Sequence, residues 1–326
     1  MPTGKVVKRR MCLERSEALR LLTMMMAEHK LCPRENRTEG LNMSLRHLPY
    51  RIPSAFIIFA VALVGLHTAG NAAPKPDLWP RWEAHDPSST ASADHSKWGL
   101  FLGRYLVTDT AAGVNLVRYA DVTPADRQLL EAYLGDLQAV RVTGLNRAEQ
   151  MAYWINFYNS LTLKVILDHY PVESITDIDI SPGLFSNGPW KAKLVEVEGE
   201  KISLDDIEHR ILRPIWEDNR IHYAVNCASI GCPNLQPEPF TAENTERLLD
   251  KGARGYIRHP RGARFAEDDR LVLSSIYDWF QVDFGGTEKG VLQHLSRYAD
   301  STFAERLKRF EGDTDYEYDW GLNEPR

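Results

Sequence analysis

The chain has 326 residues, of which 43% are hydrophobic and 26% are charged. These are the proportions of an ordinary folded protein, so they exclude a chain that is disordered throughout. The first 72 residues hold 11 of the 39 Lys and Arg and 5 of the 45 Asp and Glu, which leaves 28 basic and 40 acidic side chains and a net charge of −12 in the remainder. Such an acidic body is a poor partner for phosphates, so we expect no nucleic-acid binding.

Residues 43–72 have the three parts of a secretory signal peptide. Arg46 and Arg51 supply positive charge, and the apolar run 55–66 follows them, with small residues just before a cleavage position after Ala72. The run is shorter than the roughly 20 residues that span a membrane. We therefore predict a periplasmic or secreted protein with no stable membrane span after cleavage. The alternative is an uncleaved N-terminal anchor.

The segments on either side of the signal peptide differ from it in composition. Residues 1–42 are polar and basic, although a signal peptide begins at the N-terminus, so Met43 is the predicted start and 1–42 an extension from an earlier start codon. Residues 73–93 are rich in Pro, Ser and Ala, which predicts a linker or a loosely docked arm. Cleavage would remove Cys12 and Cys32.

The apolar pattern from 94 to 326 predicts one globular domain, with its core motifs between 147 and 286. The longest predicted helix, 147–169, is apolar on most of its circumference, so we expect it in the centre. Further helices are predicted to begin at Asp94, Thr123, Ser203, Thr241 and Ser275, and to cover 287–299 and 301–310. Short β-segments are predicted at 114–119, 193–197, 201–202, 264–266 and 271–273.

The C-terminal end is acidic, but Tyr316, Tyr318, Trp320 and Leu322 alternate with polar residues. A period of two is typical of a strand with one buried face, so we expect an ordered, docked tail. Together, the elements predict an α+β fold, a helix-rich single domain with a small antiparallel sheet.

The segment 220–235 (RIHYAVNCASIGCPNL) combines a His, an Asn, two Cys, a Gly and a Pro. We expect 222–226 to extend as a strand, and Asn226 to cap a helical turn that starts at Cys227. Unpaired backbone N–H groups at that position would lower the pKa of the Cys227 thiol and would also hold an oxyanion. Cys227 is therefore the candidate nucleophile.

A thiol nucleophile needs a base, and His222 and His209 are the nearest imidazoles in the sequence. In a regular strand His222 and Cys227 would point to opposite faces, so their pairing requires a bend between them. Glu208 has leucines four positions away on both sides, so its carboxylate is expected to face the interior. There His209, Arg213 or His222 would be its partner.

Three interpretations of the cysteine pair stay open. In an exported chain Cys227 and Cys232 are close enough in sequence for a structural disulfide. Cys227 is alternatively a catalytic or redox thiol. A zinc site of the two cysteines with His222 and His209 is the third, but no second cysteine pair accompanies them. We predict neither a metal nor a cofactor.

Two asparagines on the long helix form a second candidate group. Asn156 and Asn159 are three positions apart and so share a face of the helix. Buried amides require hydrogen-bond partners. One interpretation is that they bind and orient a ligand or an imidazole together with Asn226. The other is that they join the helix to neighbouring loops.

Several of these segments, in this order, resemble a known family. The similarity covers roughly 100–326 and is carried by 154–159 (WINFYN), 203–213 (SLDDIEHRILR), 222–229 (HYAVNCAS), 231–233 (GCP), 275–280 (SIYDWF), 283–286 (DFGG) and 318–323 (YDWGLN). These motifs are similar to those of the domain of unknown function 547 family. The resemblance implies kinship with exported bacterial proteins and with plant and animal proteins that carry this domain. It implies no established activity, but it implies one spatial site formed by Asn156, Asn159, Glu208, His209, His222, Asn226 and Cys227.

Two functions agree with these patterns. The first is a thiol-dependent hydrolase or transferase of the cell envelope that acts on an amide, ester or disulfide. In it Cys227 is the nucleophile, His222 or His209 the base, and Glu208 or an asparagine the orienting group. The second is a non-catalytic binding or scaffold domain with a structural disulfide between Cys227 and Cys232. The partner would be an envelope substrate or protein.

Overall fold

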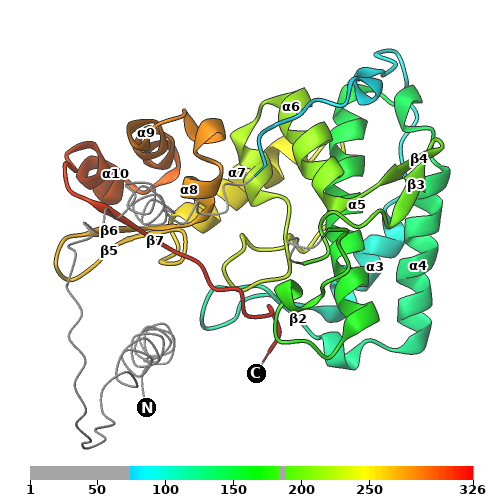
Figure 1. The fold of residues 1–326 in the computed structure, drawn as a ribbon, viewed down its shortest axis with the longest axis horizontal. Helices are drawn as coiled ribbons and strands as arrows, with labels where there is room; N and C mark the ends of the chain where they lie inside the picture. The colour runs from blue at the N-terminus through cyan, green and yellow to red at the C-terminus, as the bar shows by residue number, and fades with distance from the viewer. Residues whose placement is uncertain (1–73, 184–187, 326) are drawn as a thin grey trace, which may run out of the picture. The chain divides into compact units, whose positions relative to one another are not determined.

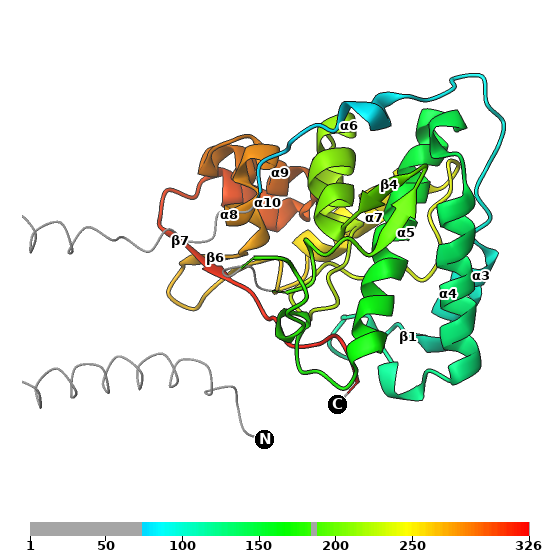
Figure 2. The same cartoon turned by 45° about the vertical axis from the view of Figure 1, so that its right-hand side comes forward.

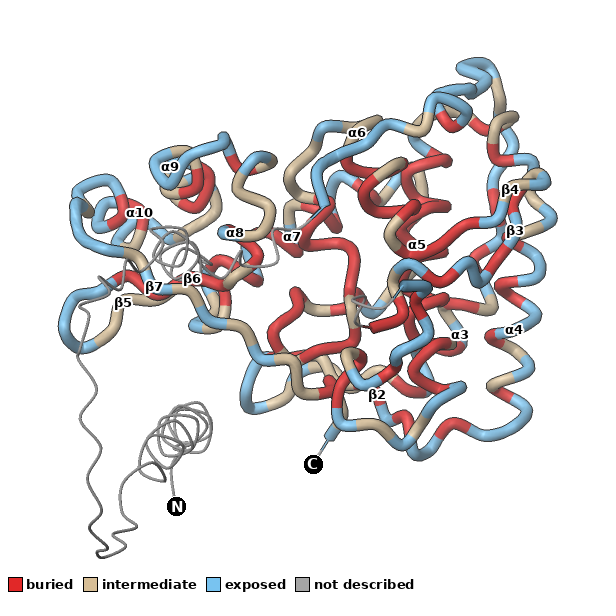
Figure 3. Tube along the Cα trace, viewed as in Figure 1, coloured by how far each residue is buried: buried red, intermediate tan, exposed pale blue. Residues whose placement is uncertain are grey.

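A long buried helix, α5 (Arg147–His169), runs through the computed structural model, which describes residues 74–183 and 188–325 (Figure 1). Its N-terminus is capped by the Asn146 side chain, which accepts a hydrogen bond from the N–H of Glu149. The helix has the bounds that the sequence predicts. Figure 3 shows it buried along most of its length, as expected for a helix that is apolar nearly all round.

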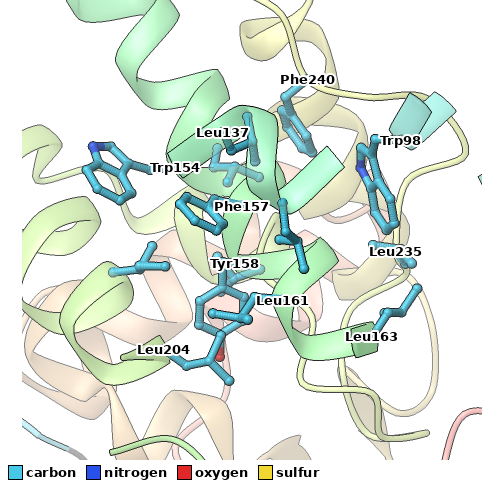
Figure 4. Close-up of a cluster of buried hydrophobic side chains, with 14 of the residues drawn as sticks. Trp98, Leu137, Trp154, Phe157, Tyr158, Leu161, Leu163, Leu204, Leu235 and Phe240 are labelled. Atoms are coloured by element: carbon cyan, nitrogen blue, oxygen red, sulfur yellow. The ribbon is translucent and has the colours of Figure 1, made fainter. Parts of the chain in front are cut away.

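The main hydrophobic core surrounds α5. Trp98 enters it from α3 (Ser96–Tyr105) and Leu137 from α4 (Pro124–Ala139), and both lie near Phe157 of α5 in Figure 4. Thr123 caps α4 as predicted, since its side chain accepts from the N–H of Asp126. The long helix is thus held by neighbours on several sides.

The remaining elements follow in chain order and keep the α+β, helix-rich class that the sequence predicts. The short ones before α6 are η1 (Pro80–Glu83), β1 (Leu106–Val107), β2 (Leu116–Val117), η2 (Tyr119–Asp121), η3 (Val142–Gly144), η4 (Ile175–Asp177), β3 (Val195–Val197), β4 (Glu200–Ile202) and η5 (Asp206–Leu212). The later ones are α6 (Arg213–Trp216), η6 (Asn219–Tyr223), α7 (Thr245–Ile257), β5 (Ala263–Phe265), β6 (Leu271–Ser274), α8 (Ile276–Trp279), η7 (Gln281–Phe284), α9 (Glu288–Tyr298), α10 (Ser301–Lys308) and β7 (Thr314–Glu317).

The sheets are small. The pairs β1–β2, β3–β4 and β5–β6 are antiparallel, as the sequence predicts. The pair β6–β7 is parallel, because α8, α9 and α10 cross over between these two strands. A second hydrophobic core lies between this three-stranded sheet and helices α7 to α10, at the opposite end of the domain from α3 and α4 (Figures 1 and 2).

The C-terminal tail is ordered and docked, which confirms the prediction from its alternating pattern. Tyr316, Tyr318 and Trp320 are half-buried, and Leu322 is buried, whereas the residues between 315 and 319 on the other face are exposed. Beyond β7 the tail crosses the domain toward β2, where the N–H of Val117 donates to the carbonyl of Asn323. The tail therefore connects the two ends of the domain.

The segment that precedes the domain is docked on it as well. The backbone N–H groups of Asp77 and Trp79 donate to the carbonyls of His209 and Arg210, at 2.9 and 3.0 Å. The Trp82 ring is 1% exposed and packs edge-on against Trp154 of α5. The arm that the composition predicts to be a linker or a loosely attached segment is therefore part of the packed structure from Pro74 onward.

Two local expectations are wrong. Residues 222–226 do not form a strand, since 219–223 is the 3₁₀-helix η6. No helical turn begins at Cys227, because Ala228 has φ of +60°, a left-handed conformation that ends any helix. The predicted helix after Ser203 does exist, but its middle, η5, is π-helical: the N–H of Arg213 donates to the carbonyl of Glu208, five residues back.

The extension over 1–42 and the signal peptide over 43–72 lie outside the described residues. Within 74–183 and 188–325, none of the helices combines the length and the apolar character needed to cross a membrane.

Candidate functional site

The two cysteines lie in a loop that turns back on itself after η6. The Asn226 side chain accepts from the N–H of Ala228 at 2.8 Å, and the N–H of Cys232 donates to the carbonyl of Ser229 at 3.1 Å. The left-handed Ala228 lies between these two turns. The loop therefore brings Cys227 and Cys232 together although neither belongs to a helix or strand.

Four side chains, here called the thiol cluster, meet in this loop: Cys227, Ser229, Cys232 and Tyr318. The Tyr318 hydroxyl lies 3.2 Å from the Sγ of Cys227 and donates to the Sγ of Cys232 at 3.2 Å. Ser229 Oγ lies 2.9 Å from the same hydroxyl and 3.3 Å from Cys227 Sγ. Both cysteines are free thiols, so the disulfide of the scaffold interpretation is not formed in this structure.

The thiol that the loop favours for ionisation is Cys232, not Cys227. The N–H of Cys227 donates to Cys232 Sγ at 3.0 Å, so the backbone donor expected to serve Cys227 serves the other sulfur. Burial raises the pKa of Cys232, but the hydrogen bonds from Cys227, Tyr318 and Ser229 outweigh it and lower the pKa to about 7. The pKa of Cys227 is raised, first by its hydrogen bond with Cys232 and then by burial. The expectation of a thiolate at Cys227 is therefore reversed.

The C-terminal tail completes the thiol cluster from the far end of the chain. The N–H of Ile230 donates to the carbonyl of Gly321 and that of Gly231 to the carbonyl of Asp319, both at 2.8 Å. A Cβ on Gly231 would lie 2.9 Å from the backbone N and O of Asp319, so only glycine permits this approach. The pairing brings the Tyr318 hydroxyl to the two sulfurs.

A second group, here called the ionic cluster, consists of Glu208, His209, Arg213, His222 and Asp283. Arg213 Nε donates to Asp283 Oδ2 at 2.6 Å, and its Nη1 donates to the carbonyl of Pro74 at 2.6 Å and to His209 Nδ1 at 3.0 Å. His222 Nε2 donates to Asp283 Oδ2 at 2.6 Å, and its Nδ1 lies 3.8 Å from Glu208 Oε1. The wide π-helical turn of η5 brings Glu208 and Arg213 to this one group.

The charges of the ionic cluster largely compensate one another. Burial would raise the pKa of Asp283, but hydrogen bonds from His222 and Arg213 outweigh it and lower the pKa to about 2. Burial lowers the pKa of His209 to about 4, so this imidazole is neutral and accepts from Arg213 through Nδ1. The Phe280 ring covers the cluster, stacked 4.3 Å from His222 and 4.8 Å from the Arg213 guanidinium carbon.

Tyr158 of α5 connects the two clusters. Its side chain hydrogen-bonds to Glu208 of the ionic cluster. Burial raises the pKa of Tyr158 well above its usual value, and the negative charges of Glu208, Cys227 and Cys232 raise it further. The sequence analysis did not identify Tyr158, Tyr318, Ser229 or Asp283 as site residues, although the motifs around 154–159, 229, 283 and 318 contained all four.

The three asparagines bind backbone groups. Asn156 donates to the carbonyl and accepts from the N–H of Phe240, at 2.7 and 3.0 Å. Asn159 donates to the carbonyl of Ala224 at 2.9 Å and accepts from the N–H of Asn226 at 2.8 Å. The Asn226 amide also donates to the carbonyl of Pro233 at 2.7 Å. These amides hold the loops on α5, and their role toward a ligand stays a prediction.

The structure separates the predicted nucleophile from the predicted bases. In the described part of the chain, the hydrogen bonds of Cys227 Sγ go to Ser229 and Tyr318, and those of His222 and His209 go to Asp283 and Arg213. Residues 74–183 and 188–325 contain no group of three or more His, Cys, Asp or Glu placed to hold a metal ion. The Cys–His pairing therefore has no direct contact behind it.

Comparison with known families now adds to this geometry. The family described as "Protein of unknown function, DUF547" matches residues 142–257. The chain carries a DUF547 domain. No curated protein and no solved structure matches the chain.

The matched DUF547 segment does not contain the whole site. It includes α5, η5, η6 and the cysteine loop, and so supplies both thiols and four members of the ionic cluster. Asp283 and Tyr318 lie beyond residue 257, in η7 and in the tail. In this chain the DUF547 site is therefore completed by the C-terminal 69 residues.

Replacing Gly231 with alanine tests the attachment of the tail. The new Cβ would contact the Asp319 backbone at 2.9 Å, so we expect a loss of about 1–3 kcal/mol in the free energy of unfolding in urea. The matched control is Gly255→Ala in α7, where nothing lies within 4 Å of the new Cβ, and we expect a gain of up to about 1 kcal/mol. Equal stabilities for the two variants would contradict the tight pairing of loop and tail.

The acid sensitivity of the ionic cluster follows from Asp283. Its folded pKa of about 2 lies below the ordinary value of 3.8, so its contribution to stability is complete above about pH 4 and disappears as the pH falls to about 2. Asp283→Asn should destabilise the protein at pH 6, and the difference from wild type should shrink by about 2 kcal/mol toward low pH in urea unfolding. Asp278→Asn, at an exposed position on α8, is the control and should follow the wild-type profile. A pH-independent effect of Asp283→Asn would exclude the ion pairs as its cause.

Proposed function

We propose that this protein is an exported thiol enzyme whose reactive group is the Cys227/Cys232 pair, and that it acts by thiol–disulfide exchange. The observation that supports this most is the convergence of the Cys227 N–H and the Tyr318 hydroxyl on Cys232 Sγ. Donors aimed at one sulfur stabilise a thiolate, the form that reacts with disulfides. A purely structural thiol has no need of them.

The two sulfurs have complementary positions for such a reaction. Cys227 is half-buried and so is the sulfur that a substrate reaches, whereas Cys232 is 4% exposed. The two thiols hydrogen-bond to each other, so the proton of Cys227 passes to Cys232 as Cys227 becomes the attacking thiolate. The pKa of about 7 at Cys232 supplies one negative charge to the pair near neutral pH.

The reaction then has two exchange steps. In the first, Cys227 Sγ forms a bond to one sulfur of the substrate disulfide, and the other substrate sulfur leaves as a thiolate and takes the proton from Cys232. In the second, the Cys232 thiolate attacks Cys227 Sγ, and the second substrate sulfur leaves. The substrate disulfide is reduced to two thiols and the pair is oxidised to a disulfide. The reverse sequence oxidises a dithiol.

The exchange chemistry is tested on the full chain with Cys12 and Cys32 replaced by serine, so that every thiol signal comes from the pair. Glutathione disulfide is the probe, and the products are read by mass spectrometry. We expect a reversible Cys227–Cys232 disulfide. In the additional Cys232→Ser variant a glutathione adduct should accumulate on Cys227, because no second sulfur resolves it. In Cys227→Ser the adduct on the buried Cys232 should form at least tenfold more slowly.

Two outcomes would contradict the proposal. One is that neither thiol reacts in the folded chain faster than free glutathione does. The other is that the disulfide forms but glutathione cannot reduce it again, which would indicate a structural bridge and the scaffold function.

Export to the periplasm or the medium is the second part of the proposal, and it is supported by the pattern of 43–72 in the sequence. When the full chain is produced in a bacterium, N-terminal sequencing of the exported protein should begin at Ala73. Deletion of 1–42 should leave export intact, whereas Ile58→Asp, in the middle of the apolar run, should abolish it. Export that continues in Ile58→Asp would exclude this segment as the signal.

A further inference from the structure

Arg261 follows α7 and contacts the cysteine loop on both sides of Cys232. Its Nη1 donates to the carbonyl of Ile230 at 2.9 Å, and its Nη2 donates to the side-chain oxygen of Asn234 at 2.5 Å. These two acceptors lie two residues before and two residues after Cys232. The guanidinium therefore spans the part of the loop that carries the more buried thiol.

This guanidinium has no carboxylate partner. It takes part in none of the ion pairs formed by 74–183 and 188–325, and its Nε is enclosed without a hydrogen-bond acceptor. The charges that act on it are those of Tyr256, Cys232 and Tyr318, in decreasing order, while burial lowers its pKa. A guanidinium held away from water requires an anion nearby. Of these three groups, only Cys232 ionises near neutral pH.

We infer that Arg261 is the counter-charge of the Cys227/Cys232 pair, a positioning residue that makes the thiolate of Cys232 the favoured form. This inference rests on the proposed thiol chemistry and adds to it the source of the positive potential. The hydrogen bonds of the thiol cluster are short-range and neutral, whereas Arg261 contributes a full charge. Because the charge is fixed at all working pH values, its effect persists throughout the exchange cycle.

The other groups that face the pair cannot supply this charge. Tyr318 from the tail, Tyr256 from α7, Tyr158 from α5 and Tyr119 from η2 are all phenols with raised pKa values. Ser229 is neutral, and Glu208 behind Tyr158 is an acid. Arg261 is therefore the one cation among the groups recorded as acting on the thiols or on their phenol neighbours in the described residues.

The test is the pH profile of iodoacetamide alkylation in the full chain with Cys12 and Cys32 replaced by serine. The wild-type pair should show a midpoint near pH 7. Arg261→Gln should raise the midpoint by about one pH unit, and Arg261→Lys, which keeps the charge, should stay within about half a unit of wild type. The matched control is Arg264→Gln, three residues away on β5, where the arginine pairs with Glu317 at the surface, and it should leave the midpoint unchanged.

The inference is overturned if Arg261→Gln folds and keeps the wild-type midpoint. It is equally overturned if Arg261→Lys raises the midpoint as far as Arg261→Gln does, because then the loop contacts and not the charge are responsible. If Arg261→Gln does not fold, the lysine variant alone decides in the same way.

The outcome is independent of the exchange reaction. A midpoint that depends on Arg261 in a protein that does not react reversibly with glutathione disulfide would remove the proposed function and keep this inference. Reversible exchange with a midpoint that ignores Arg261 would do the reverse.

Discussion

The buried amide of Asn159 is the contact on which the rest of the site depends. It projects from the central helix α5 and binds the backbone of the cysteine loop at two points, the carbonyl of Ala224 and the N–H of Asn226. The side chain of Asn226 then binds the N–H of Ala228 and the carbonyl of Pro233. A loop without regular structure is thereby fixed to the most rigid element of the domain, and the positions of both sulfurs follow from it. An unpaired buried amide or carbonyl costs about 1–3 kcal/mol, so each of these contacts also restricts the alternatives open to the loop.

The thiol cluster and the ionic cluster have different electrostatic characters. In the ionic cluster each carboxylate meets a cation within the group, and Phe280 covers it, so its charges are satisfied internally. In the thiol cluster the donors exceed the acceptors, and Arg261 adds an unpaired cation at its edge. A site that is satisfied internally stabilises a fold, whereas an excess of donors stabilises an anion that appears during a reaction. This contrast is why the reactive group is assigned to the cysteines and not to the imidazoles.

Much of the fold could be predicted from the sequence, since helices such as α4 and α5 carry both their caps and their apolar periodicity in adjacent residues. The alternating tail was predictable for the same reason. The π-helical turn of η5 was not, because the same residues satisfy an α-helical pattern and only the packing of Glu208 and Arg213 selects the wider turn. The left-handed Ala228 was not predictable either, since alanine carries no local signal for that conformation. The error at Cys227 came from this one residue: a helix start would have given its N–H groups to Cys227, whereas the turn gives that donor to Cys232.

The pairing of the cysteine loop with the tail has a consequence for the order in which the protein is made. Tyr318 lies 91 positions after Cys227 in the chain, and the parallel strand β7 can join β6 only after the helices between them have been synthesised. Contacts so distant in sequence form late, because closing the long connection costs entropy before it is compensated. A nascent or truncated chain therefore contains both cysteines in an ordinary, unactivated state. The thiols acquire their special environment only in a finished molecule, which keeps an immature chain from reacting with the disulfides of its neighbours while it is still folding.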